Sequence, residues 1–262
     1  MASEQLNNLW RDDKTAEAFW SQQEAPPYRR LLRDTIDWAS PGAGESWLDL
    51  GCGGGPLTEA IWNRTGGVVG RIVGIDLAAA NALSYDRLRR RLLPPPGDRI
   101  AFICHDFSRG IPLPDASVDH AISGLSISYA ESWSESENRW TDEAYDRLLA
   151  EVRRVIRPRG RFVFSVNVPE PAWWRVALQW LKGIFTSPEP LRFLKRSARM
   201  LRYGQWLKNQ ARIGRFHYLP VDTVAGKLRA AGFENIEHRL SYAGQAYIFR
   251  CTRPAPGGVS ER

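Results

Sequence analysis

The stretch from Ser46 to Ile61 reads Ser-Trp-Leu-Asp-Leu-Gly-Cys-Gly-Gly-Gly-Pro-Leu-Thr-Glu-Ala-Ile, and it predicts a short apolar strand, a glycine turn and the start of a helix. Glycine at positions 51, 53, 54 and 55 removes Cβ atoms where the backbone bends sharply and a ligand comes close. A dinucleotide-binding fold uses the same arrangement for a pyrophosphate, but the carboxylate of Asp49 would repel phosphates and Pro56 departs from G-x-G-x-x-G/A. The turn therefore favours a ligand that carries a cation.

Further apolar strands along the chain also end in polar or acidic residues. Arg71 to Asp76 predicts a second strand, Ala101 to Phe107 a third that closes on Asp106, and Arg161 to Val168 a fifth. A fourth strand follows the Pro-punctuated turn in residues 111–123, and Leu149 opens a stretch that supplies a helix before the fifth strand. Strands that alternate with helices predict a mostly parallel sheet, whose ligands bind at the carboxyl ends of the strands.

The order of these features resembles the class I S-adenosyl-L-methionine-dependent methyltransferases over residues 28–168 and 219–252. Their D-x-G-x-G-x-G signature is matched by Asp49, Gly51, Gly53 and Gly55, and their turn before strand four by residues 113–119. The resemblance implies a Rossmann-like α/β fold, with a seven-stranded, mostly parallel, twisted sheet flanked by helices and a helical cap inserted after the fifth strand. One departure is a slightly long stretch between the signature and Asp76, which we assign to a glycine-rich loop at residues 63–70.

The same resemblance implies a set of cofactor-binding residues for S-adenosyl-L-methionine. The glycine turn and Asp49 are expected near the methionine end, Asp76 on the ribose hydroxyls, and Asp106 on the adenine amino group. The full expected set is Asp49, Gly51, Gly53, Gly55, Asp76, Leu77, Asp106, Phe107 and Ser123. Phe107 offers a flat apolar neighbour to the adenine ring, and Ser123 faces the methionine side.

Length and composition predict one methyltransferase domain over residues 1–262. Within it we expect an N-terminal helical segment at 1–45, a basic amphipathic insertion at 171–217 and a disordered tail at 254–262. The sequence contains no apolar run of about 18 residues and no export signal, and its three cysteines are scattered, so a cytoplasmic protein, peripheral to a membrane in one interpretation, is expected. The four histidines are dispersed, and no metal site is predicted.

The net charge of +7 is concentrated in one segment. Residues 171–217 hold ten Lys or Arg and one acid, Glu189, so they carry +9 while the remainder of the chain carries −2. One interpretation is a helical cap with a solvated basic face. Another is an element that docks on an anionic membrane surface. Nucleic acid is disfavoured as a partner, because no Pro-Cys pair is present and residues 123–129, after strand four, do not contain the Asn/Asp/Ser-Pro-Pro-aromatic turn of the base-modifying enzymes.

The acceptor of the methyl group is expected to be a small, hydrophobic or lipid-like molecule. Gly124-Leu125 followed by Glu131 is similar to the quinone-biosynthesis methyltransferases, whose acceptors are lipophilic. Positioning supplies most of the rate gain in such an in-line displacement, and a base is needed only for a protonated acceptor. His217 and Tyr129 are the candidate catalytic residues, as base or acceptor contacts.

Two other functions stay open from the sequence. One is a protein that keeps the cofactor fold without catalysis and docks on a membrane or a partner through the basic helices. The other, less favoured, is an RNA methyltransferase. The sequence does not predict the oligomeric state.

Overall fold

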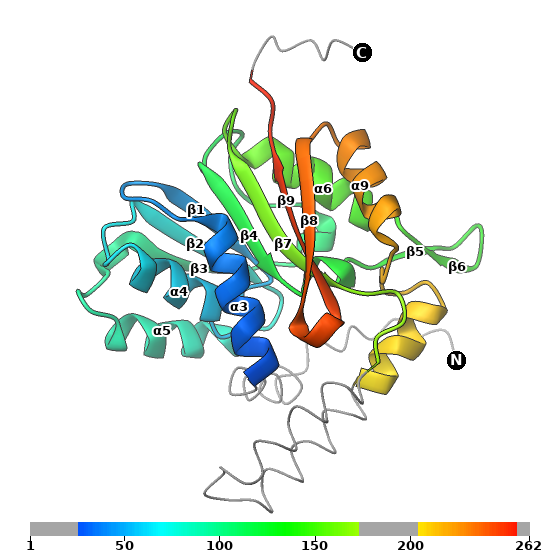
Figure 1. Ribbon diagram of the computed structural model, residues 1–262, viewed down its shortest axis with the longest axis horizontal. Helices are drawn as coiled ribbons and strands as arrows, with labels where there is room; N and C mark the ends of the chain where they lie inside the picture. The colour runs from blue at the N-terminus through cyan, green and yellow to red at the C-terminus, as the bar shows by residue number, and fades with distance from the viewer. Residues whose placement is uncertain (1–25, 173–203, 256–262) are drawn as a thin grey trace, which may run out of the picture.

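A computed structural model describes residues 26–172 and 204–255 of the chain. Its centre is a seven-stranded sheet with the order β3-β2-β1-β4-β7-β9-β8, in which β9 runs in the direction opposite to the other six strands (Figure 1). The seven strands are β1 (Ser46–Leu50), β2 (Arg71–Asp76), β3 (Ile100–Cys104), β4 (His120–Gly124), β7 (Arg161–Asn167), β8 (Glu234–Ser241) and β9 (Ala246–Thr252). The predicted mostly parallel, seven-stranded sheet is confirmed.

Helices cover both faces of the sheet. On one face lie α3 (Pro26–Ala39), α4 (Pro56–Arg64) and α5 (Asn81–Arg91), and on the other α6 (Glu143–Val155) and α9 (Val221–Ala230) (Figure 1). Strand β1 shows why both faces are covered: Trp47 packs in the first layer, Leu48 and Leu50 in the second, and all three are fully buried. Successive side chains of a strand point to opposite faces, so a strand that is apolar throughout needs a helix on each side.

The strand order places a ligand site between β1 and β4. From β1 the chain runs outward to β2 and β3 in one direction, and β4 then starts the other half of the sheet on the opposite side of β1. Connections that leave the carboxyl ends of these two strands diverge, and ligands of α/β sheets bind at this switch point. The glycine turn follows β1 and therefore lies at this point.

The structure differs from the sequence prediction at the end of β3, at the start of α6 and in one additional hairpin. Strand β3 ends at Cys104, because the carboxylate of Asp106 accepts a hydrogen bond from the Ser108 amide (3.0 Å) and opens the 3-10 turn η4 (Phe107–Arg109). Helix α6 begins at Glu143, six residues before the predicted Leu149, with acids in its first turn and arginines in its last, as the helix dipole favours. A hairpin of β5 (Ser132–Ser134) and β6 (Arg139–Thr141), which the sequence did not predict, projects from the sheet (Figure 1).

Several predicted segments lie wholly or partly outside the described residues. Of the N-terminal segment 1–45 the structure describes 26–45, and of the basic segment 171–217 it describes 171–172 and 204–217, with residues 204–212 helical. Of the tail 254–262 it describes 254–255. Among the helices that the structure describes, none combines the length and the apolar character needed to span a bilayer.

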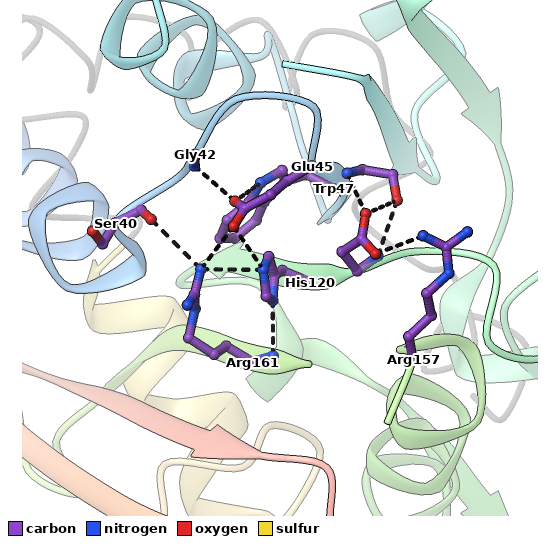
Figure 2. Close-up of polar contacts among 9 residues, drawn as sticks. Ser40, Gly42, Glu45, Trp47, His120, Arg157 and Arg161 are labelled. Atoms are coloured by element: carbon purple, nitrogen blue, oxygen red, sulfur yellow. Dashed lines mark hydrogen bonds and ion pairs between the residues drawn. The ribbon is translucent and has the colours of Figure 1, made fainter. Parts of the chain in front are cut away.

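The opposite edge of the sheet, at the amino ends of the strands, is held by polar groups (Figure 2). The backbone amide of Arg161 donates to His120 Nδ1 (2.9 Å), so the ring proton is on Nε2, which faces Glu45 Oε1 at 3.2 Å. Burial, and then the positive charge of Arg161, lowers the pKa of His120. The ring is therefore a neutral connector between β4 and β7, remote from the glycine turn.

A second group at this edge joins β1 to the chain before β4. Asp119 Oδ2 accepts from both the amide and the hydroxyl of Ser46 (2.7 Å each), and its other oxygen accepts from Arg157 at 2.5 Å (Figure 2). Burial alone would raise the pKa of Asp119, but these hydrogen bonds outweigh it and lower that pKa. Asp119 closes the motif predicted before strand four, and it has a structural role here.

Candidate functional site

The glycine turn between β1 and α4 is a left-handed bend fastened to the end of β2. Gly51, Gly53 and Gly55 have φ values of 66°, 52° and 84°, a region that residues with a Cβ rarely adopt. The amides of Gly51 and Cys52 both donate to the carbonyl of Ile75, at 2.8 and 3.1 Å. The turn is therefore a rigid part of the sheet edge.

The three glycines are needed for different reasons. A Cβ on Gly51 would lie 2.3 Å from Ser126, and one on Gly55 would lie 2.6 Å from Leu88, so at these two positions the chain itself fills the space. A Cβ on Gly53 would meet nothing within 4 Å. Of these three glycines, Gly53 is therefore the one that leaves open space for a ligand.

Asp49 lies beneath this turn and is 1% exposed. Its Oδ2 accepts from the amide and hydroxyl of Thr58 in the first turn of α4, at 3.1 and 2.8 Å, while its Oδ1 is buried without a hydrogen-bond partner. Burial raises the pKa of Asp49 to about 7; the Thr58 hydrogen bonds oppose this rise and the nearby charge of Asp76 adds to it. A cation placed above the turn would stabilise the ionised form of this carboxyl.

Asp76, the last residue of β2, ties the turn to the start of α5. Its Oδ2 accepts from the Gly53 amide (2.8 Å), and its Oδ1 accepts from the Ala78 amide (3.0 Å) and the Asn81 side chain (2.9 Å). Burial raises the pKa of Asp76 despite these donors. Asn81 was not among the residues predicted from the sequence. Its position five residues after Asp76 is the signal that could have identified it.

Asp106 and Phe107 bring the end of β3 to the same edge. Asp106 is half-buried, and Arg109 approaches its second oxygen at 3.7 Å. The Phe107 ring is close enough to Gly51 that a Cβ there would lie 3.4 Å from its Cε1. Leu77 is half-buried beside them, and its carbonyl faces the Cys104 sulfur at 3.5 Å.

Ser123 and Ser126 complete the edge on the side of β4. Both hydroxyls lie 2.8 Å from the Leu50 carbonyl, and they are 2.7 Å from each other. Ser123 is fully buried, so in this structure its hydroxyl serves the junction of β1 and β4. The predicted cofactor residues from β1, β2, β3 and β4 are thus gathered at one edge of the sheet.

The two candidate catalytic residues lie in different surroundings. Tyr129, in η5 (Ile127–Tyr129), places its hydroxyl 3.2 Å from that of Tyr218 and 3.4 Å from the Asn167 amide nitrogen. Burial raises the pKa of Tyr129 to about 12, so the phenol keeps its proton at neutral pH.

His217 is 4% exposed and packs against the Tyr145 ring of α6, with the ring centroids 5.1 Å apart. Its Nε2 donates to the carbonyl of Ala130 at 2.8 Å, because a carbonyl can only accept. Burial lowers the pKa of His217. The structure therefore does not bring the His217 and Tyr129 side chains together as a pair.

Within residues 26–172 and 204–255, no three His, Cys, Asp or Glu side chains are grouped so that they could hold a metal ion. The three cysteines are unpaired thiols, two of them buried.

Several known proteins similar to this chain are named as methyltransferases. Residues 48–164 match the family model described as a methyltransferase domain. An uncharacterized methyltransferase of Mycobacterium tuberculosis is 33% identical over 146 residues, which are 54% of this chain and 49% of that protein. A ubiquinone/menaquinone biosynthesis C-methyltransferase of Acidiphilium cryptum is 26% identical over 261 residues, covering 93% of this chain and 79% of that protein. The chain spans about half or less of the length of the first curated relatives that it matches, between 36% and 49%.

Solved structures of methyltransferases share the fold. An S-adenosyl-L-methionine-dependent methyltransferase structure from Aquifex aeolicus has a TM-score of 0.57 at 13% identity, covering 92% of this chain and 98% of its own. The N-methyltransferase NodS of Bradyrhizobium japonicum, solved with S-adenosyl-L-homocysteine, has a TM-score of 0.54 at 15% identity, covering 90% of this chain and 91% of its own. At these identities the likeness concerns the fold.

Proposed function

We propose that this chain, whose residues 48–164 match the family model of a methyltransferase domain, transfers a methyl group from S-adenosyl-L-methionine to a small apolar acceptor. The observation that carries the proposal is the turn itself: an open left-handed glycine bend, with Asp76 bound to the Gly53 amide and the buried carboxyl of Asp49 beneath it.

The donor set fits a sulfonium nucleoside. Asp49 Oδ1 is a buried carboxyl oxygen that accepts no hydrogen bond, and burial raises the pKa of Asp49 to about 7. S-adenosyl-L-methionine carries a sulfonium and an ammonium group, and a positive charge near Asp49 and Asp76 relieves the repulsion between the two acids. A pyrophosphate would increase that repulsion.

The residues that would hold this donor follow the family pattern. We assign the methionine end to Asp49, the turn amides of Gly51, Gly53 and Gly55, and Ser123. The ribose hydroxyls are assigned to Asp76 beside Leu77. The adenine is assigned to Asp106 and Phe107, whose ring already lies beside Gly51.

When bound, the donor supplies a methyl group on a positive sulfur, so attack by an acceptor lone pair breaks the carbon–sulfur bond, and the sulfur keeps the electron pair. An acceptor that enters as O–H, N–H or C–H releases one proton. The protein contributes alignment, which is the main source of rate in such a displacement. Tyr129 keeps its proton, and His217 donates to a carbonyl, so we assign neither side chain the role of a strong base.

An apolar acceptor is favoured by the aromatic residues near the ends of β4 and β7. Tyr129 contacts the Phe216 ring edge-on (centroids 4.9 Å apart) and lies beside Tyr218. The relative from Acidiphilium cryptum, which matches most of this chain, is named as a quinone-biosynthesis C-methyltransferase. A lipophilic acceptor is consistent with both observations.

The described part of the basic segment favours a cap over a membrane anchor. Three of its cations are paired with acids of the domain: Lys208 and Arg212 with Glu170 (2.5 and 3.5 Å), and Arg215 with Glu131 (3.0 Å). The Arg215–Glu131 pair is almost fully buried, with the two side chains 7% and 10% exposed. These cations hold the segment against the domain and are not presented together to a membrane.

Calorimetric titration of the full chain with S-adenosyl-L-methionine tests the proposal. We expect binding, and no binding at about 1 mM ligand, the limit of weak specific affinity, would contradict the function. Asp76→Ala should weaken the affinity by ~1–3 kcal/mol, or about 5- to 150-fold, because a charged hydrogen-bond acceptor is removed. Asp115→Ala, whose side chain is 79% exposed, is the matched control and should bind as the wild type does.

A further inference from the structure

A cluster of uncharged polar groups lies one strand beyond the glycine turn. Asn167 ends β7, Tyr129 follows β4 in η5, and Tyr218 follows the helical residues 204–212. Their polar atoms meet at the Tyr129 hydroxyl, which lies 3.2 Å from the Tyr218 hydroxyl and accepts from the Asn167 amide nitrogen at 3.4 Å. These residues come from three separated parts of the chain, so the fold assembles the cluster at the carboxyl ends of β4 and β7.

One polar atom of this cluster has no partner. Asn167 is 2% exposed, and its Oδ1 is buried without a hydrogen bond. Buried amide oxygens in folded proteins almost always accept a hydrogen bond, so an unpartnered one at the ligand-binding edge of the sheet indicates a group that a ligand can complete. A polar residue at the end of an apolar strand also matches the edge where ligands bind.

The cluster carries no formal charge. Burial raises the pKa of Tyr129 to about 12, and it raises the pKa of Tyr218 well above its ordinary value, so both phenols are neutral at physiological pH. The hydrogen bonds that join Tyr129, Tyr218 and Asn167 to one another run between two phenol hydroxyls and one carboxamide, which are all uncharged groups. A carboxylate or phosphate ligand would therefore lose its hydration without gaining a counter-charge.

The cluster borders the proposed methyl-transfer site. Ser126, which packs on Gly51, lies three residues before Tyr129 in the connection that leaves β4. On its other side, Tyr28 of α3 approaches the end of β4, since a Cβ on Gly124 would lie 4.0 Å from the Tyr28 hydroxyl. In the sheet, β4 is next to β1 and β7 is next to β4, so the ends of β4 and β7 lie one and two strand spacings, about 5 and 10 Å, from the end of β1.

The chain around the basic segment is anchored beside the same residues. The Ala172 amide donates to the Gln245 side chain, and Val168, next to Asn167, donates to the Gln245 carbonyl at 3.0 Å. The returning chain is held by Lys208 on Glu170 and then reaches Tyr218. Residues on both sides of the insertion are therefore fixed next to Asn167.

We propose that Asn167 Oδ1 accepts a hydrogen bond from a hydroxyl or N–H group of an uncharged acceptor and so orients it toward the donor turn, with Tyr129 and Tyr218 holding the amide in place. This inference rests on the proposed methyl transfer, which it deepens by naming the chemistry of the acceptor. Asn167 acts as a positioning and specificity residue: an amide left without its partner discriminates strongly against an analogue that lacks the donor.

The test uses two apolar probes that differ in one donor. The full chain is saturated with S-adenosyl-L-homocysteine, and the affinities of 1-naphthol and 1-methoxynaphthalene are measured by calorimetry. We expect the wild type to prefer 1-naphthol by about tenfold or more, and Asn167→Leu to bring the ratio close to one. Asn63→Leu, at an exposed asparagine of α4, is the matched control and should keep the wild-type ratio.

Equal binding of the two probes by the wild type, binding of neither probe, or an unchanged ratio in Asn167→Leu would overturn the inference. The affinity for S-adenosyl-L-homocysteine, measured in the same samples, separates this failure from failure of the proposed function, because only the latter abolishes it. If Asn167→Leu does not unfold cooperatively, Asn167→Ser, whose short side chain cannot reach the probe, replaces it with the same expected loss.

Discussion

The two acids beside the glycine turn are distinguished by their partners, which the sequence does not reveal. Asp76 is held by three donors, whereas Asp49 has one oxygen on Thr58 and one without a partner. A strand-end acid is easy to recognise from sequence, but its partners come from another element and depend on side-chain rotamers. The predicted roles of both acids therefore remain predictions, although the structure places them at one edge.

Asp49 should make cofactor affinity depend on pH. Burial raises its pKa to about 7 in the free protein, so below pH 7 a cation must displace a proton in order to bind beside the carboxylate. We expect the affinity for S-adenosyl-L-methionine to rise as the pH increases from 5.5 to about 7, by up to about tenfold per unit for one proton released. Calorimetry in two buffers of different ionisation enthalpy measures that proton.

Asp49→Asn is the control for this pH dependence, since its amide keeps the shape of the carboxyl and does not titrate. The variant should bind more weakly above pH 7 and show a flatter profile. A profile with the wild-type slope in Asp49→Asn would assign the proton to another group.

At the scale of elements, different glycines of the turn are needed for stability and for cofactor binding. Alanine at position 51 would adopt an unfavourable φ of 66° and bring a Cβ within 2.3 Å of Ser126, whereas alanine at 53 would meet only the unfavourable φ of 52° and open space. We expect Gly51→Ala to lower the free energy of unfolding by ~2–4 kcal/mol, the sum of strain and overpacking, and Gly53→Ala by ~1 kcal/mol. Urea denaturation measures both values.

The affinity for the cofactor should not follow the stability of these two variants. We expect the more stable variant, Gly53→Ala, to lose affinity. Gly53→Ala places a methyl group in the space assigned to the donor, so it should weaken cofactor binding while remaining well folded. Gly51→Ala should be partly rescued by Ser126→Gly, which removes the atoms that the new methyl group meets. A Gly53→Ala protein with full affinity would show that the open space is not used.

The prediction of elements succeeded where local patterns are strong. The apolar strands predicted to end at Asp76 and Val168, and the turn at Gly51, were sufficient to predict the parallel sheet. The hairpin β5–β6 was missed because each of its strands has three residues, too few for a periodic signal. The hairpin is also stabilised by contacts between residues distant in sequence, such as the Arg215 guanidinium over the Trp140 ring at 4.9 Å. For the same reason Asn167 was not selected: its significance lies in its partners Tyr129 and Tyr218, which lie distant in sequence.

For the whole molecule, two buried histidines connect pH to stability. His120 joins β4 to β7 at the amino edge of the sheet, and His217 joins its own segment to Ala130; burial lowers the pKa of both below the ordinary 6.5. The unfolded chain therefore takes up protons at a higher pH than the folded chain does. Stability from these residues is complete above pH 6.5 and is lost as the pH falls through their folded pKa values.

We accordingly expect the contribution of the two histidines to the free energy of unfolding to fall as the pH is lowered from 7 to 5, by at most ~1.4 kcal/mol per pH unit for each histidine. The carboxyls whose pKa is lowered in the fold, such as Glu45 and Asp119, add their own loss only below about pH 4.5. Asp49 works in the opposite direction, since its raised pKa makes it more stabilising as the pH falls from about 7 toward 3.8. Urea denaturation at a series of pH values measures the balance.

The test of the histidine contribution is a substitution. His120→Gln should reduce the slope of the free energy of unfolding against pH between pH 7 and 5, and His238→Gln, at an exposed histidine of β8, should leave that slope unchanged. Equal slopes in the wild type and His120→Gln would mean that the neutral ring between Glu45 and Arg161 does not set the acid limit of the fold.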